Sequence, residues 1–346
     1  MINRRQFLQA SLPLCSAVSL TAWNSLPVEG SSRKKINTVL GPVKAEKLGA
    51  TLIHEHILVD FIGADKINPD RYDSNEVQKV VLPHLLQLYK AGCRTLVECT
   101  PAYLGRDPGL LKQLSKASGL HLITNTGIYG AANDKFVPVF ATRESAEDLA
   151  HRWTQEFEKG IDQTGVRPGI IKIGIDQGPL SKIDAKLVQA AAWTHRNTGL
   201  SIATHSGDGT AALEAIEILK EARVAPDAFV WVHAQAEDDR NMHLLAAREG
   251  AWLEFDGVGK DTMEQHRDLI CNMKSCNLLS QVLISQDAGW YHVGEASGGS
   301  FRSYEFLLDQ FVPYLRRAGI LRGEIQQLLT DNPRQVLTPK VRKLIL

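Results

Sequence analysis

The feature of this chain that most limits its fold is an eightfold alternation of short apolar runs with longer amphipathic segments. The runs are rich in Val, Ile and Leu, and they cover Thr51–Leu58, Thr95–Thr100, His121–Tyr129, Gly169–Asp176, Leu200–Ser206, Phe229–Gln235, Ala251–Val258 and Gln281–Ala288. Strands that are buried on both faces have this composition, and parallel sheets are built from such strands. Eight strands that alternate with helices are what a (β/α)8 barrel requires.

The segments between the runs have apolar residues at helical spacing, and examples are Glu76–Ala91, Glu144–Gly160, Ala185–Asn197, Thr210–Ala222 and Asp238–Glu249. Glycine often closes them before the next run, at Gly92, Gly119, Gly199 and Gly250, which is typical of a helix C-cap. No low-complexity linker divides the chain. We therefore predict one α/β domain, a (β/α)8 or TIM barrel over residues 31–346. A doubly wound open sheet is the alternative, because strand counting alone does not separate the two folds.

The first 30 residues have a different pattern. Asn3-Arg4-Arg5-Gln6-Phe7-Leu8 precedes an apolar stretch without charges that ends near Trp23. A cationic start followed by a short apolar segment indicates an export signal, and the paired arginines indicate the twin-arginine pathway. The stretch is short for a membrane span. We predict a twin-arginine signal peptide over residues 1–30, with its cleavage site open, and hence a periplasmic or secreted protein without a stable membrane anchor.

The amino-acid composition argues against some classes of function. Lys plus Arg and Asp plus Glu both number 39, so the formal net charge is zero. A protein that binds nucleic acid or an anionic membrane surface usually carries a basic excess, and we predict neither partner. The cysteines beyond the predicted signal show no Cys-x-x-Cys spacing, so we expect buried free thiols rather than a zinc cluster or disulfides; they are Cys93, Cys99, Cys271 and Cys276.

The first apolar run contains the triplet His54-Glu55-His56. Because side chains alternate along a strand, the two histidines are expected on one face and Glu55 on the other. Two imidazoles at this spacing can chelate one metal ion. A hydrogen-bonded pair in the barrel floor is the alternative.

Further residues of ligand type stand near the ends of later runs. His205 lies near the end of the fifth run, His233 lies in the sixth, and Asp287 lies near the end of the eighth. The carboxyl ends of barrel strands meet at one mouth, where active sites of this fold are found. The set therefore predicts a metal site at that mouth.

Lys172 lies inside the apolar run Gly-Ile-Ile-Lys-Ile-Gly-Ile. Burial of an ammonium is costly unless the lysine is paired, neutralised or modified. A neutral lysine can add CO2 to form a carbamate, whose two oxygens can bridge two cations. A salt bridge within the barrel is the alternative.

Taken together, these residues are similar to the metal-ligand set of the phosphotriesterase family in the amidohydrolase superfamily; they are His54, His56, Lys172, His205, His233 and Asp287. The resemblance spans about residues 36–338 and includes the tail motifs Tyr304-Glu305-Phe306-Leu307 and Asp331-Asn332-Pro333. It implies two divalent metal ions. Zinc suits the nitrogen and oxygen ligands, and manganese, cobalt or iron would also fit.

The resemblance also implies a role for each residue. His54, His56 and Asp287 would hold the more buried cation, and His205 and His233 the more exposed one. Lys172, modified to N6-carboxylysine, would bridge the two together with a hydroxide. Asp287 would act as the general base. A homodimer is a further expectation at the level of the family.

Two positions depart from the family pattern. Well-studied members have an aspartate three residues after the sixth-strand histidine, where this chain has Ala236, so a simple carry-over of the proton relay fails. Gln235 or Glu237 is a candidate replacement. Gly257 stands where lactonase-like members tend to have an arginine. These departures leave the substrate open.

Two long loops, residues 130–142 and Gly289–Arg302, are expected at the mouth as substrate cover. Candidate residues of the substrate pocket are Tyr103, Tyr129, Trp290 and Tyr291. We predict a hydrolase of an ester-like bond in a small molecule: a lactone, a carboxyl ester or a phosphotriester. The alternatives are an amidohydrolase or deacetylase of the same superfamily, and an exported metal-binding barrel without catalysis.

Overall fold

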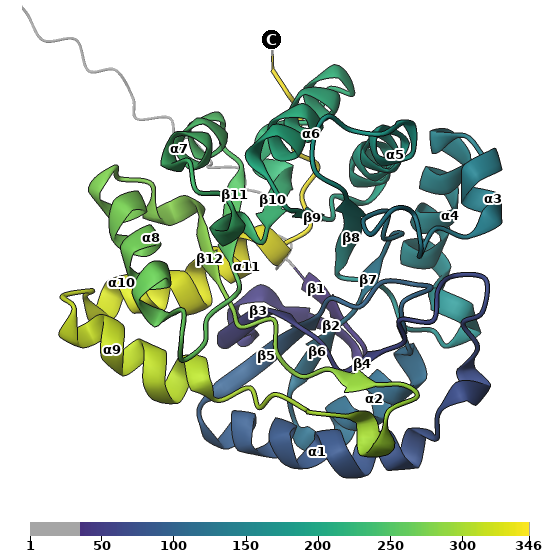
Figure 1. The fold of residues 1–346 in the computed structure, drawn as a ribbon, viewed down its shortest axis with the longest axis horizontal. Helices are drawn as coiled ribbons and strands as arrows, with labels where there is room; N and C mark the ends of the chain where they lie inside the picture. The colour runs from purple at the N-terminus through teal and green to yellow at the C-terminus, as the bar shows by residue number, and fades with distance from the viewer. Residues whose placement is uncertain (1–34, 346) are drawn as a thin grey trace, which may run out of the picture. The chain divides into compact units, whose positions relative to one another are not determined.

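Parallel strands follow one another in chain order around the centre of the computed structural model, which describes residues 35–345 (Figure 1). The eight positions are filled by β3 (Ala50–Glu55), β5 (Cys93–Glu98), β6 (His121–Ile123) with β7 (Asn125–Thr126), β8 (Ile170–Ile175), β9 (Ile202–Ser206), β10 (Phe229–Val232), β11 (Trp252–Phe255) and β12 (Val282–Ile284). Every neighbouring pair that forms a ladder is parallel. Each of the eight predicted runs therefore coincides with one of the eight strand positions of the ring.

The ring of strands closes where the chain beyond β12 meets β3. The Asp287 amide donates to the His54 carbonyl at 3.2 Å, and the His56 amide donates to the Ala288 carbonyl at 2.8 Å. An open doubly wound sheet has two free edges and lacks such contacts. The arrangement is consistent with the (β/α)8 barrel predicted from the sequence.

Helices surround the strands (Figure 1). The principal ones are α1 (Ser74–Lys90), α2 (Pro108–Ser118), α4 (Ala146–Lys159), α5 (Lys182–Thr198), α6 (Gly209–Glu221), α7 (Arg240–Glu249) and α8 (Met263–Ser275). The five predicted helices correspond to α1, α4, α5, α6 and α7. The predicted C-cap glycines Gly119, Gly199 and Gly250 have φ angles of 79°, 74° and 108°, a backbone region that suits glycine.

Apolar side chains form two clusters, one on each side of the strand ring. The inner cluster includes Ile53, Val97, Ala203 and Val230, which alternate along their strands with residues of the outer cluster. The outer cluster fills the layer between strands and helices. Lys172 and His205 take inward positions in this alternation, directly beyond the inner apolar layer.

Short elements cover the two ends of the barrel. The hairpin of β1 (Lys35–Thr38) and β2 (Gly41–Lys44) lies near the start of β6, since the Val39 amide donates to Leu122. At the other end β4 (Leu58–Val59) pairs with β13 (Tyr291–His292). The remaining α-helices are α3 (Val139–Arg143), α9 (Val312–Arg317), α10 (Arg322–Gln326) and α11 (Asn332–Leu337).

The predicted signal peptide, residues 1–30, lies outside the described residues. Among the described helices none is both long and apolar enough to cross a membrane. All four cysteines beyond residue 30 are free; Cys93 and Cys99 are buried as expected, whereas Cys271 and Cys276 are only partly buried. The latter two lie on or just after the surface helix α8, which presents one face to solvent.

Candidate metal centre

His54 and His56 come from the end of β3, where the strand is irregular. Leu52 packs in the outer cluster and Ile53 in the inner one, and the pairing with β5 shifts register between Leu52 and Glu55. Because of this shift His54 faces the barrel interior as Ile53 does, and His56 faces it again one alternation later. A bulge therefore brings both histidines into one cavity.

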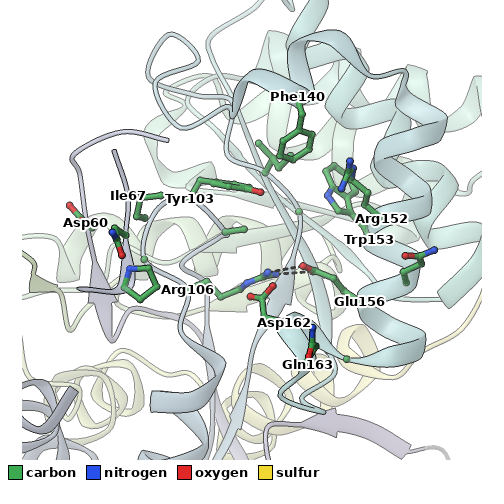
Figure 2. Close-up of a pocket in the computed structure, with 18 of the residues that line it drawn as sticks. Asp60, Ile67, Tyr103, Arg106, Phe140, Arg152, Trp153, Glu156, Asp162 and Gln163 are labelled. Carbon is green, nitrogen blue, oxygen red and sulfur yellow. Dashed lines mark hydrogen bonds and ion pairs between the residues drawn. The ribbon is translucent and has the colours of Figure 1, made fainter. Parts of the chain in front are cut away.

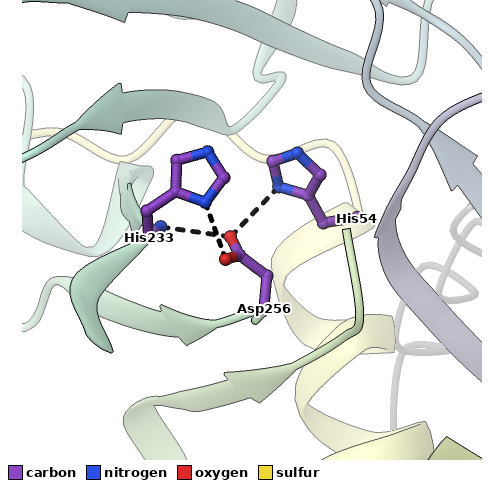
Figure 3. Close-up of side chains that lie close together, drawn as sticks. All are labelled: His54, His233 and Asp256. Atoms are coloured by element: carbon purple, nitrogen blue, oxygen red, sulfur yellow. Dashed lines mark hydrogen bonds and ion pairs between the residues drawn. The ribbon is translucent and has the colours of Figure 1, made fainter. Parts of the chain in front are cut away.

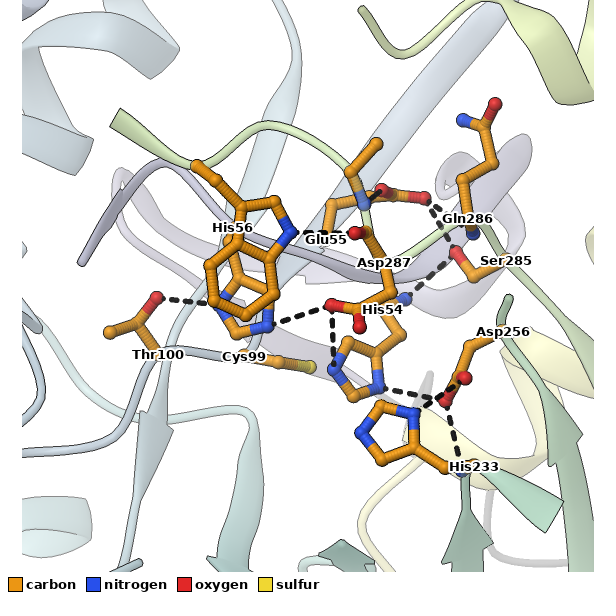
Figure 4. Close-up of polar contacts among 12 residues, drawn as sticks. His54, Glu55, His56, Cys99, Thr100, His233, Asp256, Ser285, Gln286 and Asp287 are labelled. Carbon is orange, nitrogen blue, oxygen red and sulfur yellow. Dashed lines mark hydrogen bonds and ion pairs between the residues drawn. The ribbon is translucent and has the colours of Figure 1, made fainter. Parts of the chain in front are cut away.

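One ring nitrogen of His56 is held, which leaves the other for a ligand. Nδ1 lies 2.8 Å from Thr100 Oγ1, and Nε2 lies 3.1 Å from an oxygen of Asp287 (Figure 4). Burial lowers the pKa of His56 to about 4, so the ring is neutral at pH 7. Neutral imidazole with a fixed tautomer is the form that binds divalent metals.

His54 and His233 share one carboxylate, that of Asp256 just after β11 (Figure 3). Asp256 lies 2.7 Å from His233 Nδ1 and 3.3 Å from His54 Nδ1, and Glu254 approaches His54 Nδ1 to 2.6 Å. Against the effect of burial, the two imidazoles hold the pKa of Asp256 well below its ordinary value, so it stays an anion. These three residues also have the spacing of a metal site. Their nearest atoms are already paired, and we therefore assign Asp256 to orientation of the imidazoles.

The backbone of His233 is left-handed, with φ at 61°. Val232 belongs to the inner cluster, so regular alternation would turn the next side chain outward. The left-handed residue instead turns His233 into the cavity. Strain of this kind in a residue other than glycine often marks a functional site.

Lys172 and His205 lie on the adjacent strands β8 and β9 and line the same cavity. Lys172 is only 2% exposed, and among the described residues no carboxylate forms an ion pair with its ammonium. The centre of the Tyr129 ring lies 5.7 Å from Nζ. A buried lysine without a counter-ion is costly. Burial also lowers the pKa of His205 well below its ordinary value, so this imidazole is neutral.

Glu55, which does not line the cavity, holds the segment that carries Asp287. One of its oxygens accepts from Ser285 Oγ at 2.7 Å and from the Gln286 amide at 3.1 Å, and the other accepts from the Ala288 amide at 2.7 Å (Figure 4). Three contacts on both sides of Asp287 therefore fix its backbone, which is left-handed with φ at 51°.

The unsatisfied oxygen of Asp287 is the best test of whether these residues suit a metal. Oδ1 is buried and makes no hydrogen bond of good geometry within the described residues. It lies 3.1 Å from His56 Nε2 and 3.8 Å from His54 Nε2, and the three ligand atoms lie within 4.8 Å of one another. Two imidazole nitrogens and a carboxylate oxygen form a common ligand set for divalent cations. His54, His56 and Asp287 therefore suit a divalent metal ion.

All six candidate ligands line one cavity of about 360 Å³. Tyr129 and Trp290, predicted for the substrate pocket, line it as well. The sequence did not single out the other lining residues, which are Phe61, Cys99, Pro101, Leu104, Ala132, Lys135 and Phe136. Several of them belong to the predicted cover loop 130–142, but no spacing showed which of its residues face inward.

Tyr103 and Tyr291, also predicted for the substrate pocket, do not line this cavity. Tyr103 has a left-handed backbone and lines a neighbouring cavity of about 690 Å³, whose lining includes an ion pair at 2.7 Å between buried Arg106 and half-buried Glu156 (Figure 2). Tyr291 belongs to β13 and is buried, so strand alternation turns it away from the side of Trp290.

The neighbourhood of Ala236 shows what the two candidate relay residues do. Glu237 accepts from the Gly209 amide and from the amide of Asp239, both at 2.8 Å, so it stabilises the start of α6. Gln235 instead donates to Asp256 at 2.7 Å. A side chain at Gly257 would meet Gln235, since a Cβ atom there would lie 2.8 Å from the Gln235 amide nitrogen. Gln235 therefore occupies the space that an arginine would need.

The sequence contains a pattern that indicates Glu254 as an inward-facing residue of the site. Trp252 lies in the inner cluster, and Glu254 and Asp256 follow it at the two-residue period of a strand. Two acids on the inward face of an apolar strand require a buried partner. The sequence does not connect Glu254 with His54, because that contact joins residues 200 positions apart.

A barrel that gathers buried histidines, an aspartate and a lysine at the carboxyl ends of its strands defines a metal-dependent hydrolase. A comparison with protein families agrees: the model described as the phosphotriesterase family matches residues 34–337. The chain belongs to the phosphotriesterase family.

Relatives and solved structures match most of the chain. It is 29% identical to the phosphotriesterase homology protein of Escherichia coli K12, over 83% of this chain and 97% of the relative. It is 28% identical to the N-acetyltaurine hydrolase of Salmo salar, over 88% and 98%. The organophosphorus hydrolase of Deinococcus radiodurans superposes with a TM-score of 0.79 at 25% identity, over 89% of this chain and 98% of that one.

Proposed function

We propose that this protein is a hydrolase with two divalent metal ions that cleaves an ester-like bond in a small molecule: a lactone, a carboxyl ester or a phosphotriester. The observation that carries the proposal is the convergence of six candidate ligands from five strands on one cavity, with Asp287 Oδ1 left unsatisfied. The solved organophosphorus hydrolase with the same fold supports the proposal.

In this proposal His54, His56 and Asp287 hold one cation, and His205 and His233 hold the other. Lys172 would link them after its neutral amine has added CO2, with loss of one proton, to give a carbamate. When bound, the two ions supply a hydroxide nucleophile at neutral pH and polarise the carbonyl or phosphoryl oxygen of the substrate. Zinc suits the ligands, and manganese, cobalt or iron would fit.

The protein's own groups do the remaining work. Asp287 takes the proton of the attacking oxygen at its carboxylate, which Glu55 holds in place through the flanking backbone. Thr100, Asp256 and Glu254 keep the Nδ1 atoms of His56, His233 and His54 occupied, which leaves each Nε2 for a metal ion. The aromatic walls, which include Tyr129 and Trp290, exclude water around the substrate.

The test is turnover by metal-loaded protein on a panel of a lactone, an aryl ester and a phosphotriester. We expect hydrolysis of at least one of them, which chelation abolishes and added zinc or manganese restores. Full occupancy by two metals without any turnover would contradict the proposal and favour the alternative of a metal-binding barrel without catalysis.

Amide hydrolysis is the second candidate. It is favoured by the N-acetyltaurine hydrolases among the relatives, since N-acetyltaurine is an amide. An N-acetylated amino sulfonate and an N-acetylated amino acid in the same panel separate the two. A kcat/KM higher for these amides than for every ester would assign the protein to the amide class.

We also propose export by the twin-arginine pathway, to the periplasm or the medium. The support is the order of Arg4-Arg5, Phe7-Leu8 and the apolar stretch in residues 1–30.

A further inference from the structure

Aromatic rings surround the metal cavity in a closed series of contacts. Neighbouring ring centres lie between 4.1 and 6.1 Å apart, in the order His56, Trp290, Phe61, Phe136, Tyr129, His205, His233, His54 and again His56. One part of this belt consists of candidate ligands, and the opposite part is uncharged. A flat or apolar group of the substrate is therefore expected against the uncharged part.

Lys135 stands at this uncharged part. Apart from the six candidate ligands, it is the one charged side chain among the described residues that line the cavity. It is exposed, its Nζ lies 5.5 Å from the centre of the Phe136 ring, and no described carboxylate forms an ion pair with it. A cation that lacks a counter-ion at an apolar mouth is placed to meet an anionic ligand.

The backbone before Lys135 is strained and is held by a dedicated contact. Ala132, Asn133 and Asp134 are left-handed in succession, with φ at 66°, 55° and 59°. Such residues cost energy wherever they are not glycine. The Asp176 carboxylate, which follows β8, accepts from the Ala132 and Asn133 amides at 2.9 and 3.1 Å. The Asp176 carboxylate therefore stabilises the turn that places Lys135 at the cavity.

We propose that Lys135 binds an anionic group of the substrate, a carboxylate or a sulfonate, remote from the bond that is cleaved. The substrate class is then an ester, lactone or amide whose flat or apolar body joins the reacting bond to one anion. This inference rests on the proposed hydrolase function and narrows it, because neutral phosphotriesters lack the group that Lys135 binds.

The test compares 4-acetoxybenzoate with its neutral methyl ester, on metal-loaded protein. For Lys135→Met, which keeps an apolar stem against Phe136, we expect the ratio of kcat/KM between anionic and neutral ester to fall about tenfold, mainly through a higher KM. Lys135→Arg should keep the ratio. Lys66→Met serves as the control, because Lys66 is an exposed lysine that does not line the cavity.

A second readout does not need turnover. Calorimetry measures binding of the product 4-hydroxybenzoate to the same proteins, and we expect weaker binding to Lys135→Met that depends less on salt. If binding depends on Lys135 while no ester or amide is cleaved, the proposed function fails and the anion site stands. If Lys135→Met changes neither the ratio nor the binding, the inference is wrong.

Discussion

Asp256 contacts several groups of the candidate site, although it does not line the cavity. Its carboxylate accepts from His233 and Gln235 and approaches His54, and it also accepts from the His233 backbone amide at 3.1 Å. This buried anion therefore orients His233 and, together with Glu254 at 2.6 Å, His54; the two imidazoles belong to different cations in the proposed centre.

We expect Asp256→Asn to weaken metal binding about 10- to 100-fold. An asparagine can accept at only one of its two side-chain atoms, so one of the N–H groups of His233 or Gln235 that Asp256 binds would face another N–H group. Metal content after dialysis against limiting zinc measures the effect. The control is Asp268→Asn, an exposed acid on α8. Unchanged affinity in Asp256→Asn would show that the imidazoles do not need this carboxylate.

Lys172 allows a direct test of the proposed bridge. We expect Lys172→Ala to bind at most one metal per chain, because the carbamate that links the two cations cannot form. The wild-type protein equilibrated with 13C-bicarbonate should show a carbamate carbon by NMR, and the variant should lack it. Lys182→Ala, at the start of α5, is the matched control. Two metals bound normally to Lys172→Ala would rule out the bridge.

Which site residues could be predicted depended on how each one is positioned. Lys172 and His205 obey regular strand alternation, so their inward direction followed from the sequence. His233 and Tyr103 have left-handed backbones, and in His233 this reverses the direction that strand alternation predicts. In His233 this brings a candidate ligand into the cavity, whereas Tyr103 does not line it. No periodicity in the sequence indicates such a residue when it is not glycine.

At the level of elements, the eight strand runs were predictable because a barrel strand is apolar on both faces. Their ends were not, because the apolar pattern continues into loops: the run Phe229–Gln235 gives a strand that ends at Val232. The mouth itself depends on contacts between distant loops. Lys135 belongs to the loop after β7, whereas Phe61 follows β4 and Trp290 precedes β13, and sequence alone does not place three such loops together.

The junction of β3 with the chain beyond β12 closes the barrel and carries three candidate ligands. Glu55 supplies its polar contacts, which satisfy Ser285 and two backbone amides. In Glu55→Ala these buried donors lose their acceptor, and we expect a loss of about 3 kcal/mol or more in the free energy of unfolding. Urea unfolding of the metal-free protein measures it, which separates stability from metal binding.

A matched change elsewhere keeps that experiment specific. Glu76→Ala removes an exposed glutamate from the first turn of α1, and we expect it to change stability by less than about 0.5 kcal/mol. A Glu55→Ala protein as stable as Glu76→Ala would mean that the main-chain contacts between His54, His56 and the segment after β12 close the barrel without help from Glu55.

For the molecule as a whole, the candidate site exists only in the folded chain. Its ligands lie between residues 54 and 287 and come together when the ring of strands closes. The binding of a metal to such a site is coupled to folding. A protein exported unfolded would have to bind its metals after transport, whereas the twin-arginine pathway carries folded proteins.

A change in the signal should therefore block export and leave the loading of metal intact. We expect Arg4→Lys combined with Arg5→Lys to leave a folded, metal-loaded precursor in the cytoplasm, because the changes lie far from the ligands in sequence but alter the paired arginines. Cell fractionation with metal analysis of the purified protein measures both. Lys35→Arg, at an exposed position beyond the predicted signal, should be exported normally. If the double variant reaches the periplasm as wild type does, the arginine pair is not the export signal. The twin-arginine pathway then gives no reason for metal binding to precede transport.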